Sequence, residues 1–237
     1  MAEGGSEPKV KWVPLESNPE VMNKFIDVLG VENMQFTDVY GLDPELLGMV
    51  PSPCCSLILL FPVTEKYEEF RILEEEKYKK DPQSIPASTY YMKQTISNAC
   101  GTVAIIHCIA NSMDDQLVLK EGPLRKLILE SKGMTPLEKG KKLETCQELS
   151  EAHQAAGEEG QSSVPSPGDR VDLHFVAFVH RGGQLIELDG RKSTPITHGL
   201  CTKETFLSDC AKVCQEFMLR DPSEQRFTMI ALASSTN

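Results

Sequence analysis

The sequence contains no apolar run of the ~18 residues that a membrane-spanning helix needs. Its first residues, Met1-Ala-Glu-Gly-Gly-Ser, also lack the basic region and the apolar core of a secretory signal. These two absences predict a soluble, intracellular protein, and we expect it in the cytoplasm.

Cysteine patterns that hold metals or small disulfide scaffolds are missing as well. The chain has eight cysteines, but no CxxC pair occurs among them. Cys54 and Cys55 are adjacent, and Cys210 and Cys214 lie one helical turn apart, which is not the spacing of a disulfide framework. We therefore expect reduced thiols in a reducing compartment, and we predict neither a metal site nor a cofactor.

Positive charge is scarce. The sequence has 24 Lys and Arg against 35 Asp and Glu, for a net charge of −11. This balance argues against nucleic acid or an anionic membrane as a partner, and it permits a basic protein partner. A length of 237 residues with 40% hydrophobic residues suits one domain with a full core, and we expect a monomer.

The order of the predicted elements indicates an α/β fold, a mostly antiparallel central sheet flanked by helices. We expect a disordered tail over residues 1–9 and one domain over residues 10–234. Asn18 is a good N-cap and Pro19 a good first residue for a helix that Gly30 ends. Further helices are expected from Asp43, from Pro123, after the capping box Thr135–Glu138, and over residues 203–219; strands are expected over residues 35–40, 56–61, 171–179, 184–190 and 226–233.

Two segments have ambiguous sequences. Residues 65–80 are rich in charge and predict a helix or excursion with a solvated face. Residues 157–168 contain three glycines and two prolines, which argues against regular structure there. This second segment is either a linker between domains or a functional loop, and we favour the loop because the strands after it resemble part of the same sheet.

Residues 93–107 contain the first candidate for chemistry. Polar residues lead into Cys100, and the apolar run that follows predicts a buried helix starting there. A cysteine on the first turn of a helix is exposed to free N–H groups and to the helix dipole, which stabilise a thiolate. Gln94, slightly upstream, can direct its amide N–H to the same place, although a small buried core cysteine is the alternative.

A predicted hairpin contains the second candidate. With Gly182-Gly183 as a two-residue turn, the strand register places Asp189 opposite Val176 and diagonal to His174 on one face. Backbones at such positions lie roughly 7–8 Å apart, so the carboxylate can accept the imidazole N–H. Alternatively, His174 is simply a buried histidine with any polar partner, and Asp189 only ends a strand. The remaining histidines, His107, His153, His180 and His198, have no equivalent partner in the sequence.

The stretch Gln94-Thr-Ile-Ser-Asn-Ala-Cys100-Gly101-Thr102 closely resembles the active-site segment of the ubiquitin carboxyl-terminal hydrolases, specifically the small single-domain cytosolic isozymes. The resemblance extends over most of the chain, through Trp12 and residues 14–19, 38–41, 43–47, 61–62, 93–102, 171–175, 187–192 and 226–227. Residues 65–86 and 157–168 follow the family pattern less closely, which affects the expected substrate preference but not the expected activity.

The resemblance implies the roles of four residues. Cys100 is the nucleophile, His174 the general base, Asp189 the acid that orients it, and Gln94 an oxyanion donor. It also implies a papain-like cysteine protease arrangement with a knotted backbone, and ubiquitin or a ubiquitin-like modifier as the partner. The residues expected to contact ubiquitin are Pro14, Leu15, Glu16, Ser17, Asn18, Pro19, Gly157, Glu158, Glu159, Gly160, Gln161, Ser162, Ser163, Val164, Glu224, Gln225, Arg226, Phe227, Thr228 and Met229.

Two functions follow from this resemblance. The first is a thiol peptidase that hydrolyses the bond after the C-terminal glycine of ubiquitin or a relative. It would prefer small or unfolded leaving groups, because the loop over residues 157–168 is implied to cross the cleft. The second is a ubiquitin-binding module with suppressed catalysis that sequesters free ubiquitin. Turnover of a fluorogenic ubiquitin C-terminal amide distinguishes the two.

Overall fold

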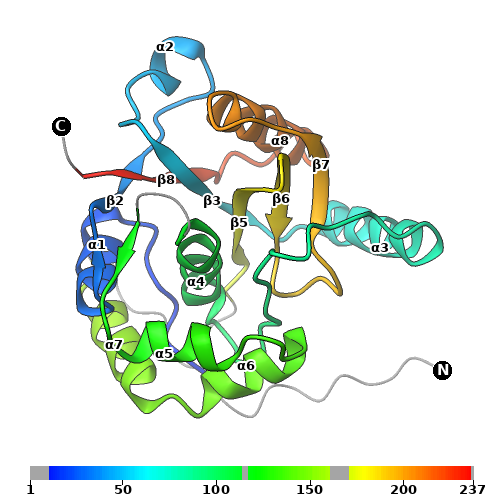
Figure 1. Ribbon diagram of the computed structural model, residues 1–237. Coiled ribbons are helices and arrows are strands. Elements are labelled where there is room, and N and C mark those ends of the chain that lie inside the picture. Colours follow the sequence, from blue (N-terminus) through cyan, green and yellow to red (C-terminus); the bar gives the residue numbers. More distant parts are fainter. Residues whose placement is uncertain (1–10, 114–116, 161–170, 236–237) are drawn as a thin grey trace.

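The computed structural model describes residues 11–113, 117–160 and 171–235. Its centre is a six-stranded sheet with the strand order β2-β8-β3-β5-β6-β7 (Figure 1), in which all neighbouring strands are antiparallel. The strands are β2 (Met34–Asp38), β3 (Cys54–Pro62), β5 (Leu173–Arg181), β6 (Gln184–Leu188), β7 (Ile196–Leu200) and β8 (Thr228–Ser234); β1 (Val31–Glu32) and β4 (Val118–Leu119) form a separate pair. The predicted α/β class with an antiparallel sheet is confirmed.

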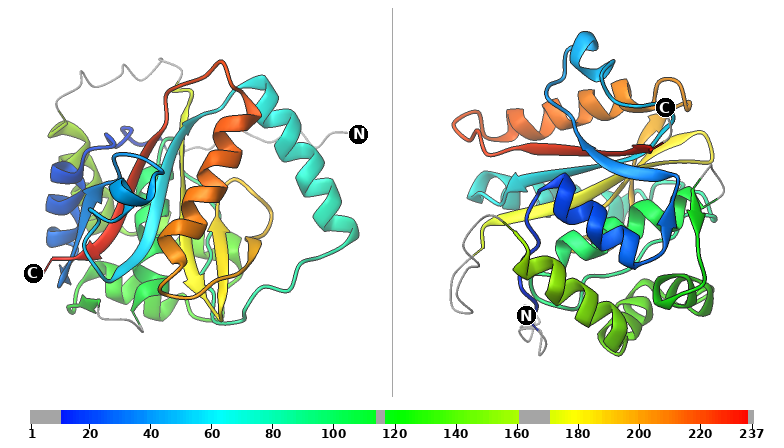
Figure 2. Two further views of the ribbon diagram at one scale, coloured as in Figure 1. Left: turned by 90° about the horizontal axis from the view of Figure 1, so that it is seen from above. Right: turned by 90° about the vertical axis from the view of Figure 1, so that its left-hand side faces the viewer.

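Helices cover both faces of this sheet, as Figures 1 and 2 show. On one face, α4 (Cys100–Ser112) packs against β3 and β5, with α1 (Pro19–Val28), α5 (Pro123–Glu130), α6 (Pro136–Glu144) and α7 (Gln147–Glu158) on its side of the sheet. On the other face, α8 (Phe206–Arg220) packs against β3 and β6 and contacts α2 (Pro44–Leu47) and α3 (Glu65–Lys80). Within the described ranges, no helix combines the length and apolar character needed to cross a membrane.

The two faces of β3 explain its continuous apolar sequence. Ile58 and Leu60 belong to the core cluster on the α4 side, whereas Leu57 and Leu59 belong to the cluster on the α8 side. A strand buried on both faces needs apolar residues at every position. The prediction of a central strand at residues 56–61 is therefore confirmed, and Trp12 is buried on the α4 side.

Local sequence signals predicted several helix ends correctly. The side chain of Asn18 accepts a hydrogen bond from the backbone N–H of Glu20 and caps α1. Thr135 and Glu138 form both hydrogen bonds of the predicted capping box at the start of α6. These caps depend only on neighbouring residues, which is why the sequence predicts them.

The hairpin between β5 and β6 has the predicted register. Gly182 and Gly183 have φ angles of 56° and 75°, in the left-handed region that a two-residue turn of this kind requires. Arg181 pairs with Gln184, and Ala177 pairs with Leu188. The chain that follows Leu188 therefore reaches the level of His174.

The prediction that residues 157–168 lack regular structure is wrong at its start. Helix α7, which the sequence did not reveal, continues through Gly157 to Glu158. Gly157 is accommodated because it packs against Val13, where an added Cβ would lie 3.1 Å from a Val13 methyl carbon. Residues 161–168 of the expected loop and the expected tail at 1–9 lie outside the described residues.

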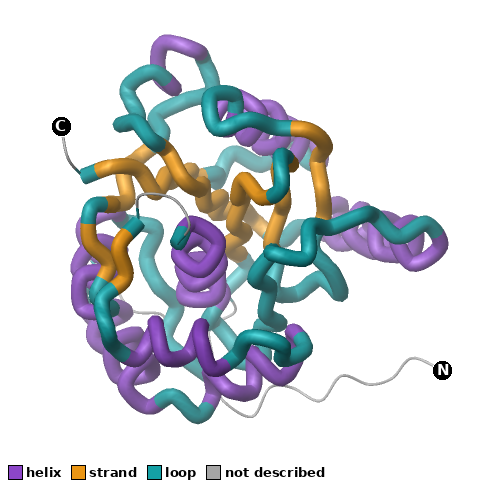
Figure 3. Tube along the Cα trace, in the orientation of Figure 1, coloured by secondary structure: helices purple, strands orange, loops and turns teal. Residues whose placement is uncertain are grey.

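Side-chain amides cover both edges of the sheet. Asn23 on α1 accepts from the N–H of Phe36 and donates to its carbonyl, at 2.6 and 2.9 Å, on the edge strand β2. At the opposite edge, Gln83 makes the same two bonds with Thr197 on β7, at 3.0 and 2.9 Å. Gln83 lies in the irregular segment that joins α3 to α4, drawn as a teal tube in Figure 3.

Candidate active site

Cys100 is the first residue of α4, as predicted. The turn before it requires an unusual backbone: Asn98 has a φ of 63°, a left-handed conformation that asparagine tolerates better than most residues. The Asn98 side chain donates a hydrogen bond of 3.1 Å to the carbonyl of Trp12, which fixes this turn against the N-terminal segment. The turn places the partly exposed Cys100 side chain on the first, positively polarised turn of the helix.

Polar groups lie near the Cys100 thiol. The imidazole of His174 on β5 and the backbone N–H groups of Gly101 and Phe175 each act to lower the pKa of the thiol. Burial alone would raise the pKa of Cys100, but the imidazole and these two N–H groups outweigh it, so the pKa lies below its ordinary value. The arrangement favours a thiolate.

His174 and Asp189 form a buried pair. The Nε2 atom of His174 lies 2.7 Å from Oδ1 of Asp189, and their side chains are 5% and 0% exposed. Burial opposes a charge on His174, but the Asp189 carboxylate and the Cys100 sulfur outweigh it and raise its pKa to about 9. Because a carboxylate only accepts, Nε2 bears the proton, and Nδ1 is left to face Cys100. The diagonal contact predicted from the hairpin is confirmed.

Gln94 is held next to the loop that carries Asp189. Its backbone N–H donates to the carbonyl of Gly190 at 2.9 Å, and its side-chain amide donates to the carbonyl of Ile96 at 3.0 Å. The amide nitrogen has two N–H bonds, and the bond to Ile96 uses one of them. Close packing at Gly190 maintains this approach, since an added Cβ would lie 2.9 Å from Gln94 Cβ.

The charged face of α3 is not merely solvated, which corrects the expectation for residues 65–80. Glu68 and Glu74 form ion pairs with Arg191 and Lys192, the residues that follow Asp189 in the chain, and Glu75 accepts from the backbone N–H of Ser193. The phenol of Tyr67 donates to Oδ2 of Asp189 at 3.3 Å. The sequence gives no sign of these contacts, because their partners lie more than a hundred residues away.

The other histidines lie outside this group of side chains. His107 accepts from the backbone of Met92, and His180 contacts the carbonyl of Cys201. His198 has an acidic neighbour that the sequence did not reveal, because its Nε2 lies 2.9 Å from the buried carboxylate of Glu187. Strand β7, which was not predicted, creates this contact by pairing with β6.

His153, for which the sequence offers no partner equivalent to Asp189, joins three parts of the chain. Its Nδ1 atom lies 2.7 Å from the hydroxyl of Thr102 on α4, and its Nε2 atom lies 2.6 Å from the carbonyl of Val13. A carbonyl only accepts, so Nε2 carries the proton and the Thr102 hydroxyl donates to Nδ1. The ring of Trp12 packs beside it, with ring centroids 4.3 Å apart.

Two of the segments expected to contact ubiquitin lie side by side. Gly157 packs against Val13 and Gly160 against Glu16, and Glu159 forms an exposed ion pair with Lys24. Leu15 and Met229, however, are each only 7% exposed, so their side chains belong to the core rather than to a surface. Residues 161–164 of the expected contact set lie outside the described residues.

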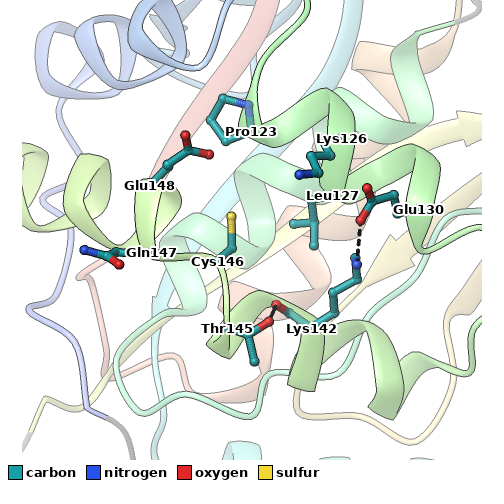
Figure 4. Close-up of a pocket in the computed structure, with 9 residues that line it drawn as sticks. All are labelled: Pro123, Lys126, Leu127, Glu130, Lys142, Thr145, Cys146, Gln147 and Glu148. Atoms are coloured by element: carbon teal, nitrogen blue, oxygen red, sulfur yellow. Dashed lines mark hydrogen bonds and ion pairs between the residues drawn. The ribbon is translucent and has the colours of Figure 1, made fainter.

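A pocket between α5, α6 and α7 is separate from the group around Cys100. The ion pair between Lys142 and Glu130, 2.8 Å long, lies on its wall (Figure 4). The residues that line it are Pro123, Lys126, Leu127, Glu130, Lys142, Thr145, Cys146, Gln147 and Glu148, none of which contacts His174 or Asp189. Among the described residues, no group of three or more histidine, cysteine or acidic side chains is placed to hold a metal.

Comparison with known proteins agrees with this geometry. The family model described as ubiquitin carboxyl-terminal hydrolase, family 1, matches residues 12–219. A ubiquitin carboxyl-terminal hydrolase of Drosophila melanogaster is 44% identical over 225 residues, which are 94% of this chain and 98% of the relative. The human ubiquitin carboxyl-terminal hydrolase isozyme L1 is 42% identical over 224 residues, with the same two coverages of 94% and 98%.

A solved structure shows a similar fold. The Trichinella spiralis UCH37 catalytic domain, bound to ubiquitin vinyl methyl ester, matches with a TM-score of 0.76 at 22% sequence identity. The match covers 98% of this chain and 99% of that one.

Proposed function

The chain belongs to family 1 of the ubiquitin carboxyl-terminal hydrolases, and on that premise we propose that it hydrolyses the bond after the C-terminal glycine of ubiquitin or a ubiquitin-like modifier. The observation that carries this proposal is a buried His174–Asp189 pair whose imidazole lowers the pKa of the Cys100 thiol on the first turn of α4. A thiol on a helix start with an oriented imidazole is the arrangement of a cysteine nucleophile.

In the first half of the reaction, the Cys100 thiolate attacks the carbonyl carbon of the terminal glycine. The His174 imidazolium then gives its proton to the leaving amine, and a thioester with Cys100 remains. Asp189 stabilises the imidazolium and fixes its orientation without taking the proton itself. In the second half, His174 removes a proton from water, which attacks the thioester and releases the free C-terminus.

The negative charge that develops on the carbonyl oxygen needs donors. The remaining amide N–H of Gln94 and the backbone N–H of Cys100, at the start of α4, are the candidates for this role. Removing one such donor typically costs about 3–4 kcal/mol of transition-state stabilisation.

The negative net charge of this chain supports a substrate whose C-terminal tail is basic. The family's substrate ends in a basic segment followed by Gly-Gly, and this chain has a net charge of −11. The exposed acidic residues Glu158 and Glu159, beside the N-terminal segment at residues 13–16, suit such a tail. A narrow approach to Cys100 would admit only glycines.

The decisive experiment compares the wild type with Cys100→Ala on a fluorogenic ubiquitin C-terminal amide. We expect the substitution to abolish hydrolysis and to leave ubiquitin binding largely intact. Cys146→Ala is the matched control, because Cys146 is also partly exposed but lines the separate pocket of Figure 4. More than a few per cent residual turnover in Cys100→Ala would remove Cys100 from its role. Binding without turnover in the wild type would favour a ubiquitin-sequestering module.

The proposal includes a cytoplasmic location, a single catalytic domain over residues 10–234 and a preference for small or unfolded leaving groups. The preference rests on the crossover loop implied by the family resemblance, of which residues 161–168 lie outside the described residues. Short peptide extensions of ubiquitin should be cleaved efficiently and ubiquitin–ubiquitin isopeptide bonds poorly. Equal rates on the two substrates would contradict this preference.

A further inference from the structure

Helix α3 is joined to the loop that carries Asp189 by hydrogen bonds and ion pairs. Three of its acidic residues hold the chain just after that residue: Glu68 bonds to Arg191, Glu74 to Lys192, and Glu75 to the backbone of Ser193. These contacts fix the helix and the loop relative to one another. They place Tyr67, which lies in the first turn of α3, against the carboxylate itself.

The phenol of Tyr67 has a defined environment. Tyr67 is 3% exposed, and its ring packs on Phe61 with ring centroids 4.6 Å apart. Phe61 in turn meets the imidazole of His174 edge-on, at 5.8 Å. Burial and the neighbouring charge of Asp189 raise the pKa of Tyr67, so its hydroxyl stays protonated and donates to Oδ2.

The two oxygens of Asp189 have different partners. Oδ1 accepts from His174 Nε2 at 2.7 Å and from the backbone N–H of Arg191 at 2.9 Å. Oδ2 accepts from Tyr67 at 3.3 Å. The terminal torsion of an aspartate is soft, so the carboxylate plane is fixed only when both oxygens are held.

We infer that Tyr67 is a positioning residue for the proposed catalytic histidine: its hydroxyl fixes the carboxylate plane of Asp189, and Asp189 thereby orients His174. The inference rests on the proposed function. The Tyr67 hydroxyl also stabilises the negative charge of Asp189 by its hydrogen bond. The attraction between Asp189 and the His174 imidazolium is weaker as a result.

Other groups also act on Asp189, and the test has to leave them unchanged. The titratable and charged groups that bond to Asp189 or interact with its charge are His174 on β5, Tyr67 on α3, Tyr91 and Lys93 in the segment before α4, His107 on α4, and Arg191 and Lys192 in its own loop. Replacing Tyr67 by phenylalanine removes one hydroxyl and leaves all the others in place.

The experiment compares Tyr67→Phe with Tyr90→Phe. Tyr90 is a matched control because it is also buried and also loses one hydrogen bond, that of its hydroxyl with Ser131 at 2.8 Å, away from Asp189. For each variant, kcat, KM and the pH dependence of kcat are measured with the fluorogenic ubiquitin amide, and circular dichroism checks the fold.

We expect Tyr67→Phe to lower kcat about tenfold, the lower end of the effect of losing a hydrogen bond to a charged group because this bond is 3.3 Å long, with KM unchanged. The alkaline limb of the kcat–pH profile of this variant should move to higher pH. Without the Tyr67 hydrogen bond, Asp189 stabilises the protonated form of His174 more strongly. Tyr90→Phe should leave kcat and the limb as in the wild type. A Tyr67→Phe enzyme with wild-type kcat and an unmoved alkaline limb would overturn the inference and leave Tyr67 with a packing role only.

A double-mutant cycle supplies a second, independent test. If Tyr67 acts through Asp189, then Tyr67→Phe has little further effect on kcat once Asp189→Asn is present. Equal effects in both backgrounds would overturn the inference. The proposed function fails separately, when the wild type does not turn over or when Cys100→Ala does, whatever the result at Tyr67.

Discussion

A larger side chain at Gly190 should disturb the site, because Gly190 follows Asp189 in the chain and packs against Gln94. A methyl group at this position would lie 2.9 Å from Gln94 Cβ, 3.1 Å from the Gln94 backbone nitrogen and 3.1 Å from Val103 Cγ1. The Gly190 backbone is outside the left-handed region, so Gly190→Ala introduces only these contacts and no backbone strain. Relieving them to ordinary carbon contacts requires a displacement of roughly 0.5–1 Å, which falls on Gln94.

The effect on rate follows from that displacement. A misplacement of about 1 Å can reduce a rate ~100-fold, and complete loss of an oxyanion donor reduces it about 100–1,000-fold. We therefore expect Gly190→Ala to lower kcat roughly 10–100-fold, less than Gln94→Ala does. Overpacking should also lower the free energy of unfolding by about 1–3 kcal/mol, equivalent to a Tm decrease of roughly 3–10 °C.

The assay measures kcat on the fluorogenic ubiquitin amide well below the Tm of each variant. Gly122→Ala is the control, because Gly122 has extended backbone and no atom within 4 Å of an added Cβ. It should leave kcat unchanged. A Gly190→Ala enzyme as fast as the wild type, beside an impaired Gln94→Ala, would refute the reasoning, since Gln94 would then tolerate the contact without moving. An unimpaired Gln94→Ala would refute the donor role itself.

Three further outcomes follow from the site and the core. His174→Ala should lower kcat by several orders of magnitude and Asp189→Asn by less, because the asparagine mainly misorients the ring; the reverse order in the fluorogenic assay would contradict their assigned roles. The value of kcat/KM should rise as the pH passes the lowered pKa of Cys100, and it should fall as His174 loses its proton near its pKa of about 9. A profile of kcat/KM without an alkaline limb below pH ~10 would contradict an ion pair between the Cys100 thiolate and the His174 imidazolium. Burial lowers the pKa of His107 and of His153 to about 4, so the stability that each contributes is complete above the ordinary pKa of 6.5 and is lost as the pH falls through 4. Each can contribute up to ~3 kcal/mol, and denaturant titrations at neutral and acidic pH should show a smaller acid loss for His153→Gln than for the wild type; an equal loss would exclude His153.

Sequence reasoning reached the parts of the site that depend on neighbouring residues. The glycine pair at 182–183 sets the turn, the turn sets the register, and the register brings His174 and Asp189 together. Cys100 was likewise placed by the helix start that its own neighbours encode. The knotted backbone that the family resemblance implies stays a prediction.

What the sequence did not reveal depends on distant partners. Helix α7 begins at Gln147, and its N-cap Cys146 makes no side-chain cap hydrogen bond, so no local signal marks its start. The sequence did not reveal the role of α3. A run of charged residues looks the same in sequence whether its side chains are solvated by water or paired with an arginine 123 positions away. The pairing of His198 with Glu187 depends on β7, a short strand whose exposed end has no apolar alternation.

The side-chain amides of Asn23 and Gln83, which bond to the two edge strands, affect how the sheet can pair with other polypeptide chains. An open edge strand is a template on which any extended polypeptide can pair and on which copies of a protein can aggregate. Asn23 and Gln83 each occupy one backbone N–H and one carbonyl of an edge strand, at the middle of β2 and near the start of β7, as a neighbouring strand would. An enzyme that, by the proposed function, handles unfolded leaving groups is thereby kept from incorporating them into its own sheet.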